Sequence, residues 1–294
     1  MTRKQIGLFI GGLLSVSWIG QLLILKTFGG ADATGAVPFL LVIMFLPGIF
    51  GLIFTVTSEN VRISVPWRPA GLSPIIVAAI VPVLIAFTVL SIIILGGFGS
   101  SDYFQFGGEA VVISSGPWVL GVGTQALPKF AANILITTLI YSAMTGLATI
   151  GEEYGWRGVL QNAMIREFGF GKGVALLGFV WGIWHIPIIL SGYNYPETPV
   201  IGAFLFMPVL LMASSFVIAW LTLWNRSFWP AVFMHGSING VYDSMISRIT
   251  LVREDAYFVK VIEIGVFVVL GLIAYFLARP IARTIGTGPA RASG

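Results

Sequence analysis

Long apolar runs, separated by short polar segments, occupy most of the 294-residue chain. A helix needs about 20 mostly apolar residues to cross a bilayer. The pattern predicts eight such helices, and therefore an all-α, polytopic transmembrane bundle that forms a single integral membrane domain over residues 1–294. The predicted spans are Ile6–Leu25, Pro38–Val56, Ile75–Leu95, Phe130–Ile150, Val174–Leu190, Ile201–Trp224, Trp229–Ser247 and Val259–Leu277. The fifth span is short, and polar residues interrupt the seventh.

Composition supports a membrane environment. Hydrophobic residues make up 57% of the chain and charged residues only 10%, whereas soluble domains carry roughly a quarter charged residues. Lipid tails accept the apolar side chains that a soluble surface would expose to water. The absence of cysteine excludes a disulfide framework and a thiolate nucleophile. The net charge of +4 comes from Lys and Arg spread between the apolar runs, which indicates membrane orientation rather than a nucleic-acid partner.

Charge placement predicts the orientation of the helices. With eight spans and a cytoplasmic N-terminus, eleven Lys and Arg residues fall on the cytoplasmic side and five on the far side, as the positive-inside rule requires. Both termini are then cytoplasmic, and the short loops are typical of a prokaryotic inner-membrane protein. The longest stretch between spans, Gly96–Gln125, is rich in Gly and Ser, and residues 284–294 are expected to form a disordered tail.

Polar residues inside the apolar runs are the candidates for function. Glu152, Glu153 and Arg157 directly continue the fourth apolar run. Two adjacent carboxylates at membrane depth are costly unless they are paired or functional. Glu153 and Arg157 are four residues apart and can pair on one helix face, whereas Glu152 points elsewhere and suits a general base. In the alternative interpretation, both glutamates lie solvated among the lipid headgroups.

Glycine and histidine mark two further features. Gly151 and Gly155 are four residues apart, a spacing that lets a neighbouring helix approach closely. His185 lies within the fifth span, and Pro187 frees the backbone carbonyl of Ile183 because proline has no N–H to donate. The alternative for His185 is a neutral ring bonded to neighbouring backbone.

The third polar segment carries His235 and Asn239, which are four residues apart. An imidazole and an amide on one helix face can both donate hydrogen bonds to a single oxygen, as an oxyanion hole requires. The alternative is hydrogen bonding between helices. Asp243 extends the same stripe, whereas Asn133 lies about five turns before Glu152 and is not assigned to the site.

In this order, these segments resemble the three motifs of the CAAX-protease and bacteriocin-processing family of membrane peptidases. Glu152, Glu153 and Arg157 match Glu-Glu-x-x-x-Arg. The second motif is usually Phe-x-x-x-His, and here it runs from Trp181 to His185. The third motif, His-x-x-x-Asn or His-x-x-x-Asp, is met by His235 and Asn239. The resemblance covers Phe130 to Asp243 and predicts a catalytic core over residues 126–247.

The resemblance implies an intramembrane endopeptidase in which Glu152, assisted by His185, activates the attacking water. Glu153 and Arg157 would support the first motif, and His235 and Asn239 would stabilise the oxyanion. Glu152, His185 and His235 could instead bind zinc, but His-Glu-x-x-His is absent and an amide is a poor zinc ligand. We favour the mechanism without a cofactor.

The resemblance also implies the partners. The substrate would be a peptide tail or leader, or a prenylated peptide, which reaches the site from the cytoplasmic side or from membrane lipid. The sequence does not define an oligomeric state. Two other functions stay open: a non-catalytic membrane scaffold or bacteriocin-immunity protein of the same fold, and a transporter that uses Glu and His as a proton relay.

Overall fold

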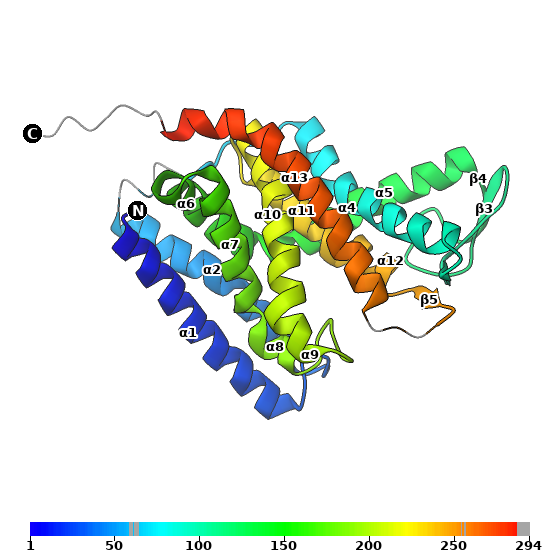
Figure 1. Cartoon of the computed structure of the whole chain (residues 1–294), viewed down its shortest axis with the longest axis horizontal. Coiled ribbons are helices and arrows are strands. Elements are labelled where there is room, and N and C mark those ends of the chain that lie inside the picture. The colour runs from blue at the N-terminus through cyan, green and yellow to red at the C-terminus, as the bar shows by residue number, and fades with distance from the viewer. Residues whose placement is uncertain (59–60, 62–64, 254, 256, 287–294) are drawn as a thin grey trace, which may run out of the picture. The chain divides into compact units, whose positions relative to one another are not determined.

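The computed structural model describes residues 1–58, 61, 65–253, 255 and 257–286, and most of them are helical (Figure 1). The α-helices are α1 (Arg3–Phe28), α2 (Val37–Thr57), α4 (Leu72–Leu95), α5 (Leu127–Glu153), α6 (Gln161–Phe168), α7 (Phe170–Trp184), α8 (Ile186–Leu190), α9 (Pro199–Ile201), α10 (Met207–Asn225), α11 (Trp229–Ser237), α12 (Asp243–Ile246) and α13 (Phe258–Gly286). The π-helical segments are η1 (Tyr154–Leu160), η2 (Gly202–Phe206) and η3 (Ile238–Tyr242). The strands are β1 (Gly99–Ser101), β2 (Phe104–Phe106), β3 (Ala110–Ile113), β4 (Gly123–Ala126) and β5 (Ile249–Leu251).

The prediction of an all-α, polytopic membrane protein is confirmed. Among the described residues, six helices are long and apolar enough to cross a membrane: Arg3–Phe28, Val37–Thr57, Leu72–Leu95, Leu127–Phe168, Pro199–Asn225 and Phe258–Arg283. The remaining two predicted spans are shorter in the structure. α7 ends at Trp184, just before His185 and Pro187, and the predicted span Trp229–Ser247 is divided among α11, η3 and α12. By helix length, the described part of the chain therefore contains six candidate spans.

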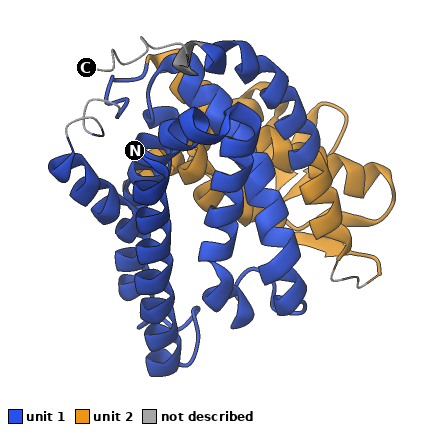
Figure 2. Ribbon diagram, turned by 60° about the vertical axis from the view of Figure 1, so that its left-hand side comes forward, with its two compact units in different colours: residues 1–70, 148–231, 267–294 blue, residues 71–147, 232–266 orange. Residues whose placement is uncertain are grey.

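The chain divides into two compact units, coloured separately in Figure 2. Unit 1 comprises residues 1–70, 148–231 and 267–294, and unit 2 comprises residues 71–147 and 232–266. The chain passes from one unit to the other just before α4 and then within α5, α11 and α13. Of the predicted tail, residues 284–286 continue α13, and residues 287–294 lie outside the described part of the chain.

Glycines allow the helices of unit 1 to pack closely, as the spacing of Gly151 and Gly155 predicts. A Cβ added at Gly155 would lie 2.3 Å from the carbonyl oxygen of Pro47 on α2, and one at Gly151 would lie 2.7 Å from the Cα of Phe45. α7 packs on α10 in the same way, because a Cβ at Gly182 would lie 2.5 Å from the Cα of Pro208. Such close backbone approach drives association where lipid removes the hydrophobic force between helices.

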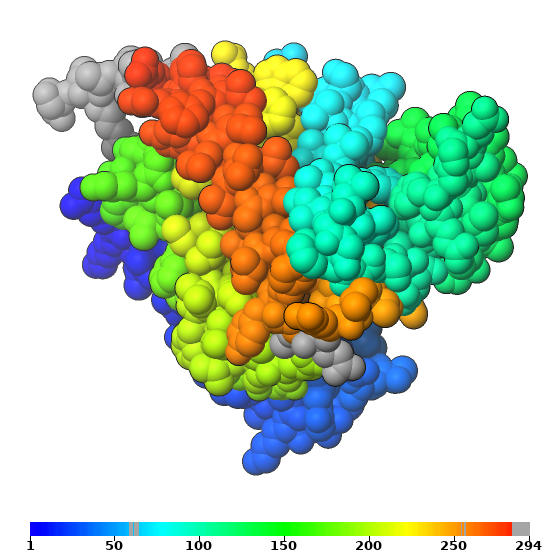
Figure 3. Space-filling view, turned by 45° about the vertical axis from the view of Figure 1, so that its right-hand side comes forward, coloured from blue at the N-terminus to red at the C-terminus, as the bar shows by residue number. Residues whose placement is uncertain are grey.

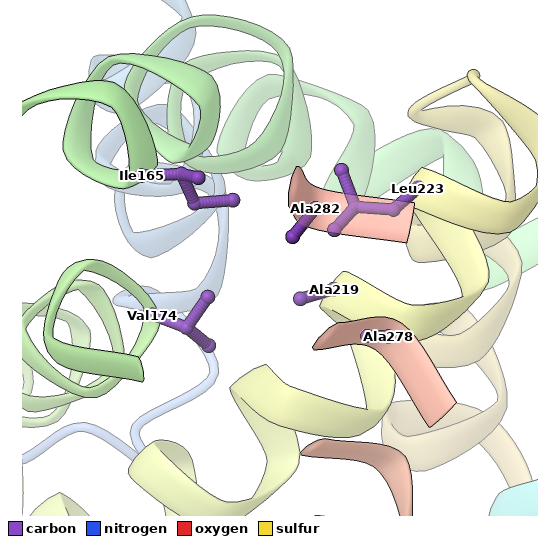
Figure 4. Packing of buried hydrophobic residues seen from close by; sticks show 6 residues of the cluster. All are labelled: Ile165, Val174, Ala219, Leu223, Ala278 and Ala282. Atoms are coloured by element: carbon purple, nitrogen blue, oxygen red, sulfur yellow. The ribbon is translucent and has the colours of Figure 1, made fainter. Parts of the chain in front are cut away.

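The core of unit 1 and its lipid-facing surface both involve α13. A buried cluster joins α6, α7, α10 and α13 (Figure 4) and consists of Ile165, Val174, Ala219, Leu223, Ala278 and Ala282. The opposite side of α13 carries exposed apolar side chains, which include Leu272, Ile273 and Phe276. Figure 3 shows this helix, in orange to red, lying at the surface. One face of α13 therefore packs in the protein core, and the opposite face is suited to contact with lipid.

Unit 2 contains two small antiparallel sheets, one of β1 and β5 and one ordered β2-β3-β4. Phe104 pairs with Ile113 in the second sheet, and Ile113 pairs with Gly123. Four of the strands lie in or next to the stretch Gly96–Gln125, which we expected only to lie outside the membrane. The rings of Phe104 and Trp118 are 5.0 Å apart between centroids. The strands were missed because three or four residues are too few to show an alternating pattern.

We predict that Gly155→Ala lowers the free energy of unfolding by about 1–3 kcal/mol, because the new methyl group would collide with the Pro47 carbonyl and force the backbones apart. Denaturant unfolding in detergent micelles measures the change. Gly11→Ala on α1 is the control, since a Cβ there meets nothing within 4 Å and should be neutral or slightly stabilising. Equal stability of the Gly155→Ala protein and the wild type would contradict the close approach.

Candidate functional site

The first motif lies where α5 passes into the π-helical segment η1. Glu152 and Glu153 are the last two residues of α5, and Arg157 lies within η1. The side chains are buried, since Glu152 is 2% exposed and Glu153 0%. The alternative in which both glutamates are solvated among headgroups is therefore wrong. Two carboxylates in such a place require specific partners.

Glu153 and Arg157 form the predicted ion pair. The Nη1 atom of Arg157 lies 2.9 Å from Oε1 of Glu153, and both side chains are fully buried. The Nη2 atom donates a hydrogen bond of 3.3 Å to the hydroxyl of Ser215 on α10. The guanidinium also lies over the ring of Trp181, with Cζ 4.0 Å from the ring centroid, where the electron-rich face attracts a cation.

Trp181 connects the first motif to the second. Its indole Nε1–H donates a hydrogen bond of 3.0 Å to Oε2 of Glu152, while its ring face lies under Arg157. Glu152 therefore has a partner other than Arg157, in agreement with the prediction that it points away from the ion pair. A phenylalanine, which is usual at this position of the motif, has no N–H and could not make this bond.

His185 is held by the same tryptophan. Its Nδ1 atom lies 2.8 Å from the backbone carbonyl oxygen of Trp181. A carbonyl can only accept a hydrogen bond, so Nδ1 carries the hydrogen, and in the neutral ring Nε2 carries the lone pair. The ring is half-buried and packs edge-on against Trp184, with centroids 4.7 Å apart. The bond to backbone that the alternative predicted is present, and it orients Nε2 as a proton acceptor.

Helix α1 binds the backbone carbonyls at the break between α7 and α8. The carbonyl of Ile183, which Pro187 leaves without its helical donor, accepts a hydrogen bond of 3.2 Å from Nε1 of Trp18. The next carbonyl, of Trp184, accepts one of 3.0 Å from Nε2 of Gln21. From the sequence, we expected α1 only to span the membrane, with no contact to the motifs. An amide within an apolar run, Gln21, was the signal that could have identified its role.

The third motif is anchored within unit 2. The backbone of α11 approaches α5 closely, since a Cβ at Gly236 would lie 2.4 Å from the carbonyl oxygen of Ser142. The Gly236 carbonyl accepts a hydrogen bond of 2.6 Å from the hydroxyl of Thr145. Ser237 donates one of 2.6 Å to the carbonyl of Ala79 on α4. These contacts fix the backbone immediately after His235.

His235 and Asn239 differ in environment. His235 lies in α11 and is 6% exposed, whereas Asn239 lies in η3 and is exposed. The expectation that they share a face assumed α-helical geometry. The backbone is instead π-helical over Ile238–Tyr242, and the wider turn changes the angle between successive side chains. Their joint role as oxyanion donors stays a prediction.

Asn133 has a structural role in unit 2. Asn133 accepts a hydrogen bond of 2.9 Å from the backbone N–H of Leu120 and donates one of 2.9 Å to the carbonyl of Gly121. It thus holds the loop before β4, in agreement with its exclusion from the site. Asp243 begins α12, directly after Tyr242, whose hydroxyl donates a hydrogen bond of 2.7 Å to Glu263.

The π-helical segments η1 and η3 coincide with the first and the third motif, respectively. Segments of this kind are rare, and they occur frequently at functional sites. Each adds a residue to a helical turn and so displaces the side chains that follow. No residue pattern in the sequence indicates them.

Glu152 and His185 belong to unit 1, and His235 belongs to unit 2. Within the described ranges, no group of three or more His, Asp or Glu side chains is arranged to hold a metal ion. Because the donor set considered for zinc is divided between the two units, zinc binding by these three residues stays a prediction. The convergence of the third motif on the first two stays a prediction.

A comparison with known protein families matches the part of the chain that carries the three motifs. Residues 132–241 match the family model of the type II CAAX prenyl endopeptidase, Rce1-like. This Rce1-like region contains all three motifs, lies within the predicted core of residues 126–247, and confirms the resemblance found in the sequence. Comparison with the curated proteins finds no match. The Rce1-like match and the apolar helices support an integral membrane protein with CAAX-type protease activity.

We predict that Arg157→Met lowers the free energy of unfolding by about 3–5 kcal/mol, because Glu153 would remain buried without its cation. The double variant Arg157→Met/Glu153→Leu should recover most of this loss, since an apolar pair of similar volume removes both charges. Unfolding of the wild type, the Arg157→Met and Glu153→Leu single variants and the double variant in one detergent measures the cycle. A double variant that is destabilised by the sum of the two single losses would show that the charges do not depend on one another.

Proposed function

We propose that this chain is an intramembrane endopeptidase of the CAAX-prenyl-protease type, which cleaves a peptide by means of water activated by Glu152. The observation that supports the proposal most directly is the hydrogen bond from Trp181 to the buried carboxylate of Glu152. The Rce1-like match over residues 132–241 supports the reaction class.

Glu152 has the properties of a general base. It is sheltered from water, and the neighbouring ion pair neutralises Glu153, so Glu152 is the carboxylate available for proton transfer. In the proposed first step, Glu152 removes a proton from water while Nε2 of His185 accepts a hydrogen bond from the same molecule. Positioned proton transfer of this kind accelerates reactions about 10²–10⁴-fold.

The second step proceeds through a tetrahedral intermediate. The water oxygen forms a bond to the scissile carbonyl carbon, and the carbonyl oxygen becomes an oxyanion that accepts hydrogen bonds from His235 and Asn239. The C–N bond then breaks, and the proton held by Glu152 passes to the leaving amine. Water is consumed, and a carboxylate and an amine are formed. Fixed donors at an oxyanion lower the barrier because they need no reorientation during the reaction.

The substrate we propose is a peptide tail or leader, and a prenylated peptide is the form that the family match favours. A prenyl chain would lie in lipid while the peptide enters from the cytoplasmic side. In a prokaryotic inner membrane, this side carries the excess of Lys and Arg that the span pattern predicts.

We predict that Glu152→Gln abolishes cleavage, with kcat reduced about 10²–10⁴-fold, because an amide cannot take a proton from water. The amide oxygen can still accept the hydrogen bond from Trp181, so the fold should be preserved. Cleavage of a peptide library, with prenylated and unprenylated members, by the purified protein in lipid vesicles measures the effect. Running the assay with and without a chelator tests the metal-free mechanism.

The matched control is Glu197→Gln, the same change at an exposed position between α8 and α9, which should cleave like the wild type. Wild-type cleavage by the Glu152→Gln protein would refute the assignment and favour the scaffold or immunity alternative. Loss of wild-type cleavage in chelator, with recovery on addition of zinc, would refute the metal-free step.

We predict that Asn239→Leu lowers kcat about 10²–10³-fold with little change in KM, because the lost donor acts on the oxyanion rather than on the bound substrate. Since Asn239 is exposed, the unfolding temperature should not change, so reduced activity cannot come from misfolding. The double variant Asn239→Leu/Glu152→Gln should lower kcat by a smaller factor than the product of the two single reductions, because the two residues act in the same reaction. Wild-type kcat in the single variant would remove Asn239 from the mechanism.

A further inference from the structure

Helix α1 lies outside the Rce1-like region of residues 132–241, yet it contacts a part of the candidate site. Within unit 1 it packs along α7 and α8 (Figure 1). Trp18 and Gln21 are three residues apart and therefore lie on one face of α1. Both donate hydrogen bonds to backbone carbonyls that directly precede His185. A helix that carries no motif thus reaches the backbone beside a motif residue.

The carbonyls at the end of α7 need donors from outside the helix. The last four carbonyls of an α-helix have no donor within it. In α7 they belong to Trp181, Gly182, Ile183 and Trp184. His185 binds the first two of them. Its Nδ1 atom lies 2.8 Å from the carbonyl oxygen of Trp181, and its backbone N–H donates a hydrogen bond of 3.1 Å to the carbonyl of Gly182.

α1 supplies the donors for the other two carbonyls. The indole N–H of Trp18 donates a hydrogen bond of 3.2 Å to the carbonyl of Ile183. The side-chain amide of Gln21 donates one of 3.0 Å to the carbonyl of Trp184. The following helix cannot replace the first donor, because Pro187 stands four residues after Ile183 and has no N–H. The end of α7 is therefore completed by His185 and α1 together.

The burial of Gln21 is consistent with a specific role. Its side chain is only 1% exposed, although it lies within an apolar run. Burying an amide is unfavourable unless it forms hydrogen bonds, and polar residues at membrane depth commonly serve a function. The neighbouring Ile19 and Leu22 are 61% and 57% exposed. α1 therefore directs its apolar side chains outward and its amide toward α7.

The bonds from α1 act on His185 in two ways. Ile183 and Trp184 directly precede it in the chain, so donors on their carbonyls fix the peptide planes to which His185 is attached. The ring of Trp184 also packs edge-on against the imidazole, with centroids 4.7 Å apart. His185 itself lies between α7 and α8 with φ of −86° and ψ of −4°, a sparsely populated conformation in which active-site residues are often found.

We propose that α1 positions His185 for catalysis, because the donors of Trp18 and Gln21 hold the end of α7, and with it the imidazole, in one orientation. Both are positioning residues, which act through the backbone and do not contact the substrate. The expected effect on cleavage rests on the proposed function, in which His185 assists Glu152. The orientation of the ring does not rest on it.

The first test observes the imidazole directly. The chain contains two histidines, so protein labelled with isotopic histidine gives two ring signals by nuclear magnetic resonance in lipid nanodiscs, and a His235→Gln variant assigns them. Trp18→Phe and Gln21→Met each remove one donor and keep an uncharged side chain of similar shape. Each should shift the signal of His185 and leave that of His235 unchanged. Wild-type signals of His185 in both variants would overturn the proposal.

The second test measures catalysis. The double variant Trp18→Phe/Gln21→Met should lower kcat about 10–100-fold with little change in KM, because a displaced imidazole assists proton transfer less well. If this protein does not fold, Gln21→Met alone should lower kcat about 3–10-fold. Trp224→Phe is the control, since Trp224 on α10 is 47% exposed, and it should cleave like the wild type. A lower unfolding temperature with wild-type kcat would show that α1 only stabilises the fold, which would overturn the proposal.

Failure of the proposed function gives a different result from failure of this inference. Wild-type cleavage by the Glu152→Gln protein overturns the proposed function, whereas the signals of His185 in the α1 variants still report its orientation. Loss of cleavage in Glu152→Gln, together with wild-type kcat in the α1 double variant, overturns the positioning role alone.

Discussion

The buried ion pair between Glu153 and Arg157 is the interaction on which the rest of unit 1 depends. Removing two charges from water costs several kcal/mol for each ion, and the mutual attraction repays this only when further partners complete the site. Here the hydroxyl of Ser215 and the ring of Trp181 are those partners. Because the cation requires the ring beneath it, Trp181 is held in place. The N–H and carbonyl of Trp181 then position Glu152 and His185.

The glycines make this burial possible. Gly151 and Gly155 bring α2 into contact with the backbone that carries the acidic pair, and Gly182 brings α10 against α7. Side chains at these positions would separate the helices and admit water or lipid to the charges. In unit 2, Gly236 has the same effect beside His235. Small residues therefore do more than strengthen association, because they determine which polar groups are sheltered.

The candidate site was predictable in part. Glu152, Glu153, Arg157 and His185 stand out in the sequence because ionisable residues in apolar runs are rare, and the spacing of Glu153 and Arg157 predicts their ion pair. The hydrogen bond from Trp181 to Glu152 was not predictable, because it joins residues on different helices. Gln21 and Ser215 were missed for the same reason: each acts across a helix interface, and only the packing of those helices reveals the contact.

The sequence by itself determined that this is a polytopic helical membrane protein, because hydropathy over about 20 residues is a local property that lipid selects directly. It also determined the three motifs and their order along the chain. The tertiary structure alone decided that the helical repeat becomes π-helical at η1 and η3 and that α7 ends before His185. It also decided which carbonyls α1 binds. These features follow from steric fit and hydrogen bonding between distant segments, which no local pattern of residues contains.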